Sequence, residues 1–104
     1  AVDFLQAVVK VVRDIRAANP GKKVPYYCDP VLGDNGKCYV PPALIDVYKN
    51  EVVSIATVLT PNQFECELLT GIKIERTADL QKTFDHFHKR GVEKVIITSL
   101  DGLE

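Results

Sequence analysis

The sequence contains no methionine, no tryptophan and only three cysteines among 104 residues. Cys28, Cys38 and Cys66 are widely spaced and form no CxxC pair, which argues against a disulfide framework or a structural zinc site. No apolar run approaches the ~20 residues that a membrane-spanning helix needs, and no secretory signal is visible. These absences predict a cytoplasmic protein with reduced thiols and no membrane partner.

An excess of charge is also absent, because 13 basic residues stand against 14 acidic ones. Nucleic-acid binding would require a basic excess, so this class of partner is not expected. The longest basic cluster, Lys22-Lys23, is too short for a polybasic membrane patch. Apolar residues make up 46% and charged residues 26%, which is typical of a folded globular domain.

Hydrophobic spacing predicts helices that alternate with short strands. Apolar residues three and four apart, with caps and glycine or proline stops, predict the helices, and β-branched runs predict the strands. The expected order is α-β-α-β-α-α-β, typical of a parallel sheet with helices on its faces. The consecutive apolar residues at 95–97 predict a last strand buried on both faces. The expected helices are 3–18, 41–50, 63–69 and 77–90, the expected strands are 24–28, 57–59 and 94–98, and 29–39 is expected as a loop.

Both ends of the sequence suggest a larger protein. It starts at Ala1 without an initiator methionine and stops at Glu104 just after an expected strand. Three strands would leave an apolar edge unpaired, which a complete domain normally covers. We therefore expect residues 1–104 to be one partial domain of marginal stability.

Polar side chains follow each expected strand, where open α/β sheets bind their ligands. Carboxylates there would repel a triphosphate, so a cation must lie between them, and Mg²⁺ takes one or two carboxylates with waters and phosphate oxygens. The helix after Asn62 should add free N–H groups and a positive dipole end. The candidate cation groups are Asp29, Asp34 and Glu65, and the candidate phosphate or ribose groups are Thr60, Asn62, Thr98 and Ser99.

Structural explanations stand beside these functional ones. Asp29-Pro30 and the segment 34–36 could be turn formers, and Asn62 with Glu65 could be only a capping box. The hydroxyls of the segment 98–99 could simply end a strand. Cys28 and Cys66 are expected to be small buried residues, and His86 and His88 to face solvent. The sequence has neither GxxxxGK[ST] nor GxGxxG, which argues against P-loop and dinucleotide-binding sites.

Three segments in this order resemble the pyridoxal kinase family: CDPVLGD at 28–34, TPNQFE at 60–65 and ITS at 97–99. TPN with a nearby carboxylate alone would indicate only the wider ribokinase-like superfamily. The resemblance implies a three-layer α/β fold of the ribokinase type. It also implies transfer of the γ-phosphate of ATP to the 5′-hydroxyl of pyridoxal, pyridoxine or pyridoxamine.

The resemblance assigns roles to individual positions. It places Asp29 and Thr60 near a monovalent cation, K⁺ or Na⁺, and Asp34 and Glu65 near Mg²⁺. Family members are commonly homodimers, so the parent protein is expected to be one. The stretch between Asp34 and Tyr39 is shorter than in vertebrate members. The ATP site implied by the resemblance comprises Asp34, Tyr39, Asn62, Gln63, Phe64, Glu65, Thr98 and Ser99.

The sequence lacks two parts of that family. The GTGD segment that carries the catalytic base does not occur, and neither does the amino-terminal part that forms most of the pyridoxal pocket. The chain by itself is therefore expected to be inactive. The alternatives are a hydroxymethylpyrimidine kinase or another ribokinase relative, a non-catalytic truncated product that binds nucleotide or a partner chain, and a generic α/β domain.

Overall fold

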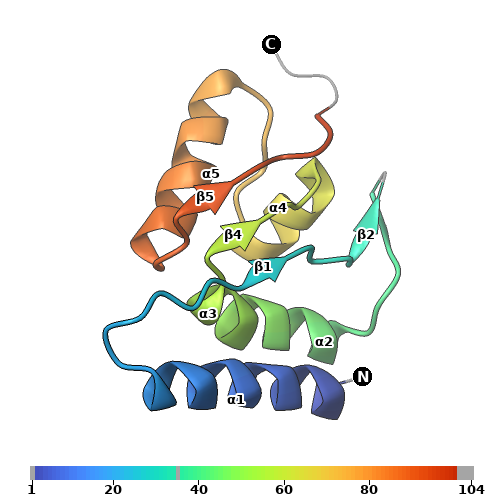
Figure 1. Ribbon diagram of the computed structural model, residues 1–104. Helices are drawn as coiled ribbons and strands as arrows, with labels where there is room; N and C mark the ends of the chain where they lie inside the picture. Colours follow the sequence, from blue (N-terminus) through green and yellow to red (C-terminus); the bar gives the residue numbers. More distant parts are fainter. Residues whose placement is uncertain (1, 35, 101–104) are drawn as a thin grey trace.

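The computed structural model describes residues 2–34 and 36–100 and confirms the expected alternation of helices and strands (Figure 1). The helices are α1 (Val2–Ala18), α2 (Pro42–Val47), the π-helical turn η1 (Tyr48–Val52), α3 (Val53–Ile55), α4 (Gln63–Thr70) and α5 (Thr77–Lys89). The strands are β1 (Tyr27–Cys28), β2 (Gly33–Asp34), β3 (Lys37–Cys38), β4 (Val58–Leu59) and β5 (Lys94–Val95).

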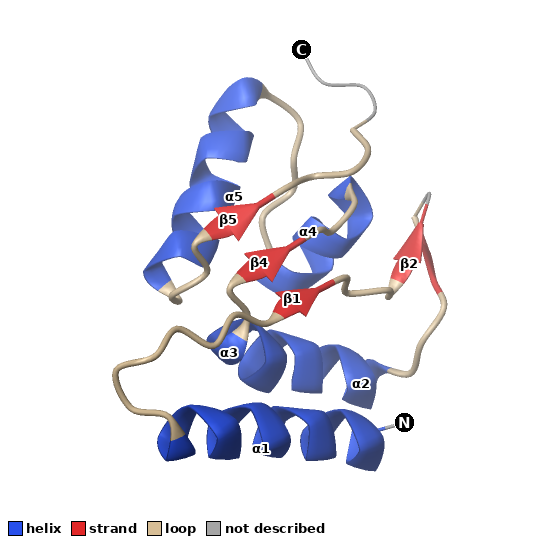
Figure 2. Cartoon of the chain, viewed as in Figure 1, coloured by secondary structure: helices blue, strands red, loops and turns tan. Residues whose placement is uncertain are grey.

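The main sheet is parallel, as predicted, with the strand order β1-β4-β5. Tyr27 pairs with Val58, and Val58 pairs with Lys94. Figure 2 shows the three arrows pointing the same way, with α4 and α5 behind them. The carboxyl ends of all three strands therefore lie at one edge of the sheet.

Helix α1 buries the apolar stripe that its spacing predicts, but only in its first half. Leu5 and Val9 join the core, where α1 contacts α2, η1 and α3. Ile15, predicted to continue the stripe, is exposed. In the last turn of α1 the half-buried side chain is that of Arg16. Its guanidinium donates two hydrogen bonds to the Val24 carbonyl.

The second helical segment begins at Pro42, with Pro41 as its N-cap, close to the predicted start at residue 41. It runs past the expected end at residue 50. The π-helical turn η1 connects α2 to α3, so the helical path reaches Ile55. A π-helical turn inserts an extra residue and shifts the face that a helix presents. Val47, Val52 and Val53 are all buried along this path.

The expected loop 29–39 contains a small hairpin that the sequence analysis missed. β2 and β3 pair antiparallel, with Gly33 opposite Cys38 and Asp34 opposite Lys37. Gly36 lies between the strands with a φ of 75°, a conformation that glycine adopts without strain. Two residues per strand give too little alternation to be recognised in the sequence.

Helices α4 and α5 confirm most of the predicted boundaries. Asn62 and Glu65 form a capping box at the start of α4, and Gly71 ends it with a φ of 75°. The N-cap of α5 is Arg76 rather than the predicted Thr77. Asp79 accepts the N–H groups of Glu75 and Arg76, and these hydrogen bonds lower the pKa of its carboxyl.

Strand β5 differs from the prediction in length and burial. It covers Lys94–Val95 rather than 94–98, although Ile96 still donates its N–H to the Leu59 carbonyl. Ile96 is 49% exposed, so the expectation of burial on both faces is wrong for this strand. The reason is that β5 pairs only with β4 in the described sheet, and the apolar run alternates between its two sides.

The core can be tested with a matched pair of phenylalanine substitutions. Phe87 is 0% exposed inside the core, whereas Phe4 is 74% exposed on α1. Phe87→Ala should lower the free energy of unfolding by about 3–5 kcal/mol, because it leaves a cavity. Phe4→Ala should stay within about 0.5 kcal/mol of the parent chain. Urea unfolding followed by circular dichroism measures both, and equal effects would contradict this core.

Candidate nucleotide and metal site

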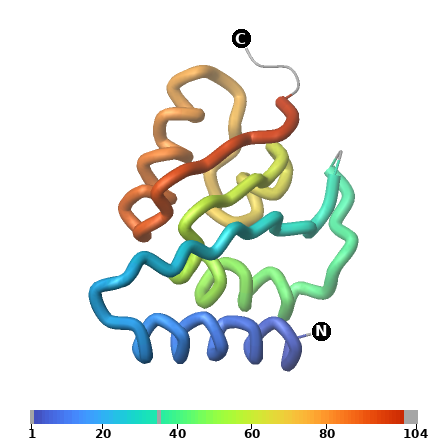
Figure 3. Tube along the Cα trace, viewed as in Figure 1, coloured from blue at the N-terminus to red at the C-terminus, as the bar shows by residue number. Residues whose placement is uncertain are grey.

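The three strand ends meet at one edge of the sheet. Asn62 Nδ2 donates to the Gly33 carbonyl over 2.8 Å, which joins the segments after β4 and β1. The Gln63 N–H donates to the Ser99 carbonyl over 3.1 Å, and the Thr98 N–H donates to the Pro61 carbonyl over 2.9 Å. The three segments leave the sheet on the same side (Figure 3). The predicted convergence of the polar strand ends is therefore present in the fold.

Glu65 is the most buried carboxylate of this edge, with 5% exposure. Its Oε1 accepts the Asn62 N–H over 2.9 Å, and its Oε2 accepts the N–H groups of Leu32 over 2.8 Å and Gly33 over 3.4 Å. The capping-box explanation of Glu65 is thus confirmed, and a second set of contacts is added to it. Its predicted contact with Mg²⁺ or its waters stays a prediction.

Gly33 is required by packing rather than by backbone conformation. A Cβ atom at this position would lie 2.3 Å from the Lys37 carbonyl oxygen and 2.6 Å from Cε2 of Phe64. Contacts this short demand a shift of backbone, so no larger residue fits without moving the hairpin. Phe64, predicted at the ATP site, therefore contacts the hairpin from the first turn of α4.

The remaining predicted ATP-site residues lie around this contact. Tyr39 follows β3, donates its N–H to the Leu32 carbonyl over 2.8 Å and keeps its side chain exposed. Gln63 extends its side-chain amide away from the edge to the Ile74 carbonyl, 3.0 Å away. Thr98 and Ser99 are exposed beyond β5. Their roles in binding ATP stay predictions.

The start of α4 offers fewer free donors than the sequence predicts. The N–H of Gln63 is bonded to the Ser99 carbonyl, and the N–H of Glu65 is bonded to Asn62 Oδ1 over 2.8 Å. The expectation of free N–H groups is therefore wrong at these two positions, since the cap and the neighbouring strand end use them. The positive end of the helix dipole still faces this edge.

The cation side of the edge consists of exposed carboxylates. Asp29 and Asp34 are exposed and Thr60 is half-buried, whereas Glu65 is committed to three backbone N–H groups. Within residues 2–34 and 36–100, no group of three or more His, Cys, Asp or Glu side chains could hold a metal. This donor set fits Mg²⁺ in the form that takes one or two carboxylates and completes its shell with waters and phosphate oxygens.

The cysteines are all free, and two of them are buried as predicted. Burial raises the pKa of the Cys28 thiol to about 11 and that of the Cys66 thiol to about 12. A nucleophilic cysteine would need a lowered pKa, so neither suits that role. Of the two histidines predicted to face solvent, His88 is exposed and His86 is half-buried beside Phe87.

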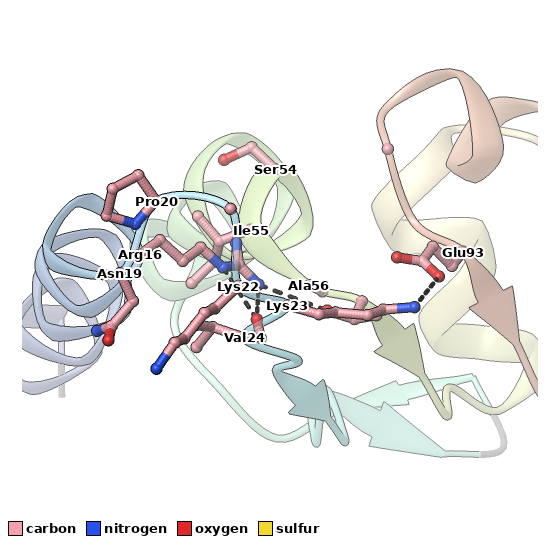
Figure 4. Close-up of a pocket in the computed structure, with 13 residues that line it drawn as sticks. Arg16, Asn19, Pro20, Lys22, Lys23, Val24, Ser54, Ile55, Ala56 and Glu93 are labelled. Carbon is pink, nitrogen blue, oxygen red and sulfur yellow. Dashed lines mark hydrogen bonds and ion pairs between the residues drawn. The ribbon is translucent and has the colours of Figure 1, made fainter.

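A separate hollow lies at the opposite end of the strands, next to residues that precede β1, β4 and β5 (Figure 4). Two of its cationic side chains are engaged: Arg16 donates to the Val24 carbonyl, and Lys23 forms an ion pair with Glu93 over 3.0 Å. No residue of the predicted site lines this hollow. It therefore lies between the end of α1, the turn that follows it and the segments before β4 and β5, and it is separate from the candidate site.

The search for membrane-spanning segments gives a negative result for the described part of the chain. Over residues 2–34 and 36–100, no helix combines the length and the apolar character that crossing a membrane requires.

Comparison with known proteins gives consistent matches. The family model described as phosphomethylpyrimidine kinase matches residues 4–103. The pyridoxal kinase of Dictyostelium discoideum is 51% identical over 100 residues, covering 96% of this chain and 32% of that protein. Human pyridoxal kinase is 45% identical over 102 residues, covering 94% of this chain and 32% of that protein. The chain thus spans about a third of the length of these relatives.

Solved structures agree with the sequence matches. The Plasmodium falciparum PdxK structure with AMP-PNP and PL has a TM-score of 0.89 and 34% identity, covering 96% of this chain and 36% of that one. Leishmania donovani pyridoxal kinase with ADP and pyridoxine has a TM-score of 0.84 and 30% identity, covering 95% and 34%.

The parallel sheet and these neighbours define an α/β protein of the ribokinase-like class. The match over residues 4–103 is more specific: the chain belongs to the phosphomethylpyrimidine kinase family.

The burial of the cysteines predicts an order of thiol reactivity. Cys38 is exposed, so iodoacetamide at pH 7.5 should alkylate it first, whereas the raised pKa values of Cys28 and Cys66 leave them as slow-reacting thiols. Peptide mass spectrometry after timed quenching measures the three rates. The Cys38→Ser variant should then show only slow labelling until the chain is unfolded in urea. Fast labelling of Cys28 in the folded chain would contradict the observed packing.

Proposed function

We propose that this chain forms the ATP and metal side of a pyridoxal kinase, which phosphorylates the 5′-hydroxyl of pyridoxal, pyridoxine or pyridoxamine. The observation that carries the proposal is the meeting of the segments 28–34, 60–65 and 98–99 at one sheet edge. The 51% identity to the Dictyostelium pyridoxal kinase supports this substrate class. So do the neighbouring structures that hold ADP or AMP-PNP with a vitamin B6 compound.

Phosphoryl transfer depends on the positioning and charge neutralisation of the phosphate groups. Asp34 would hold Mg²⁺, with Glu65 near the ion or its waters, and Mg²⁺ neutralises phosphate charge when it is bound. Thr60 would assist Asp29 with a K⁺ or Na⁺ ion. Thr98 and Ser99 offer hydroxyls to phosphate or ribose oxygens, and Tyr39 lies at the open side of the hairpin, where a bound base could contact it.

The proton of the acceptor hydroxyl must go to a base, and the described residues of the candidate edge supply none. Its carboxylates either bond backbone N–H groups or lie where the cations would bind. No GTGD segment occurs in the sequence. The chain by itself should therefore form no pyridoxal 5′-phosphate, while contributing nucleotide and metal contacts to a complete kinase. A homodimeric parent protein and a cytoplasmic location remain predictions.

The second candidate is a kinase of hydroxymethylpyrimidine or of its phosphate, which the description of the matching family model favours. Three curated relatives that are 45–51% identical to this chain are named pyridoxal kinase, and they favour pyridoxal instead. A non-catalytic product that only binds nucleotide is the remaining alternative. Substrate preference in a complete enzyme separates these three functions.

The test replaces the matching 100-residue segment of Dictyostelium pyridoxal kinase with this chain. The hybrid enzyme should convert pyridoxal and ATP to pyridoxal 5′-phosphate, measured by its absorbance, and should leave hydroxymethylpyrimidine unphosphorylated. In the hybrid, Asp34→Asn should lower kcat/KM by about 100-fold, since one charge-stabilising contact at a transferring group is worth about 3 kcal/mol.

The matched control is Asp46→Asn, which removes an exposed carboxylate on α2, outside the three strand-end segments. It should leave the hybrid unchanged. A folded hybrid without pyridoxal kinase activity would refute the proposed function, and pyridoxal 5′-phosphate formation by the 104-residue chain alone would refute the expectation that the chain needs the rest of the enzyme. Equal effects of Asp34→Asn and Asp46→Asn on kcat/KM would contradict the proposed role of Asp34 in binding Mg²⁺ and ATP.

A further inference from the structure

The first turn of α4 holds the backbone of the hairpin with three side chains. Asn62 Nδ2 donates to the Gly33 carbonyl over 2.8 Å. Glu65 Oε2 accepts the N–H groups of Leu32 and Gly33 over 2.8 and 3.4 Å. The ring of Phe64 occupies the space that a Cβ at Gly33 would need. The backbone N–H of Gly33, its backbone carbonyl and the space beside its Cα are therefore each in contact with one of these three side chains.

We propose that Glu65, assisted by Asn62, is a positioning residue that sets the location of Asp34 at the nucleotide edge. We call the contacts of Asn62, Phe64 and Glu65 with Leu32 and Gly33 the clamp. Asp34 follows Gly33 directly, so its Cα lies ~3.8 Å from the Cα of a residue that the clamp holds. The significance of Asp34 rests on the function proposed above. The clamp itself rests on the hydrogen bonds alone.

The contacts of Glu65 exceed what a helix cap needs. A capping box requires only its bond to the N–H of Asn62, which Oε1 makes. The other oxygen reaches a segment 32 to 33 residues away in the sequence. Burying a carboxylate is unfavourable unless hydrogen bonds replace its water, and here backbone N–H groups do so. The carboxylate is therefore held in place by two segments, and it holds both of them.

Within residues 2–34 and 36–100, the contacts of the hairpin with the rest of the chain come mainly from the start of α4. β2 and β3 pair only with each other, and Lys37, Cys38 and Tyr39 are exposed. The first turn of α4 is the main element packed against β2. Misplacement of a phosphate-site group by ~1 Å can lower a rate about 100-fold, so loosening this contact should affect nucleotide use.

Amide hydrogen exchange by NMR on the metal-free 104-residue chain tests the clamp. Glu65→Gln should raise the exchange rates of the Leu32 and Gly33 amides about tenfold or more, because the side chain loses its charge and keeps one acceptor oxygen where the carboxylate uses two. The control, Glu67→Gln, removes a carboxylate of the same helix that accepts the Ile74 N–H over 2.8 Å. It should raise exchange at Ile74 and leave Leu32 and Gly33 protected.

A second variant covers the case in which Glu65→Gln unfolds the chain. Asn62→Asp keeps an oxygen that can accept the Glu65 N–H, so α4 keeps its cap, but it removes the donor to the Gly33 carbonyl. Exchange at Gly33 and at the neighbouring hairpin amides should rise while α4 amides stay protected. Unchanged protection of Leu32 and Gly33 in either folded variant would overturn the clamp.

The hybrid kinase separates positioning from general stability. Glu65→Gln and Asn62→Asp should raise KM for ATP about tenfold or more without changing KM for pyridoxal, whereas partial unfolding lowers only the amount of active enzyme. Glu67→Gln should leave both constants unchanged. An unchanged KM for ATP together with an unchanged kcat per folded molecule would refute the positioning role. An inactive parent hybrid would count against the proposed function, while hydrogen exchange would still decide on the clamp.

Discussion

One buried carboxylate connects the two segments on which the candidate site depends. Glu65 accepts backbone N–H groups from Leu32, Gly33 and Asn62, so it joins the segment after β1 to the segment after β4. Both segments are irregular, and irregular backbone near the surface is held only where its polar groups find fixed partners. The rest of the edge, including the bond from Gln63 to Ser99, is built onto this junction.

Features that depend on local sequence could be predicted. Helix α4 was recognised from Asn62, Glu65 and Gly71, because a capping box and a left-handed glycine act within one or two helical turns. The parallel sheet followed from the alternation of elements, and so did the meeting of the strand ends, since parallel strands present their carboxyl ends at one edge.

Features that depend on distant contacts could not be predicted. The hairpin of β2 and β3 is held by Phe64 and Glu65, about 30 residues further along the chain, and nothing near Gly33 reveals this. The π-helical turn after Val47 lies in a path whose side chains at Val52 and Val53 are buried in the core, and these core contacts are not visible in the local sequence. Ile96 was expected to be buried because three apolar residues follow one another, but burial depends on what packs against each face, which a short run does not specify.

The distribution of charge at the edge follows from the same junction. A carboxylate whose oxygens accept three N–H groups has its charge stabilised by backbone dipoles. Asp29 and Asp34 are exposed, so water can be exchanged for a cation there at a smaller desolvation cost. The buried carboxylate of Glu65 therefore fixes the geometry of the junction, and the exposed carboxylates of Asp29 and Asp34 are the proposed cation ligands. The hydrogen bonds of Asn62 and Glu65 thus join TPNQFE to Gly33, the residue that precedes Asp34 in CDPVLGD.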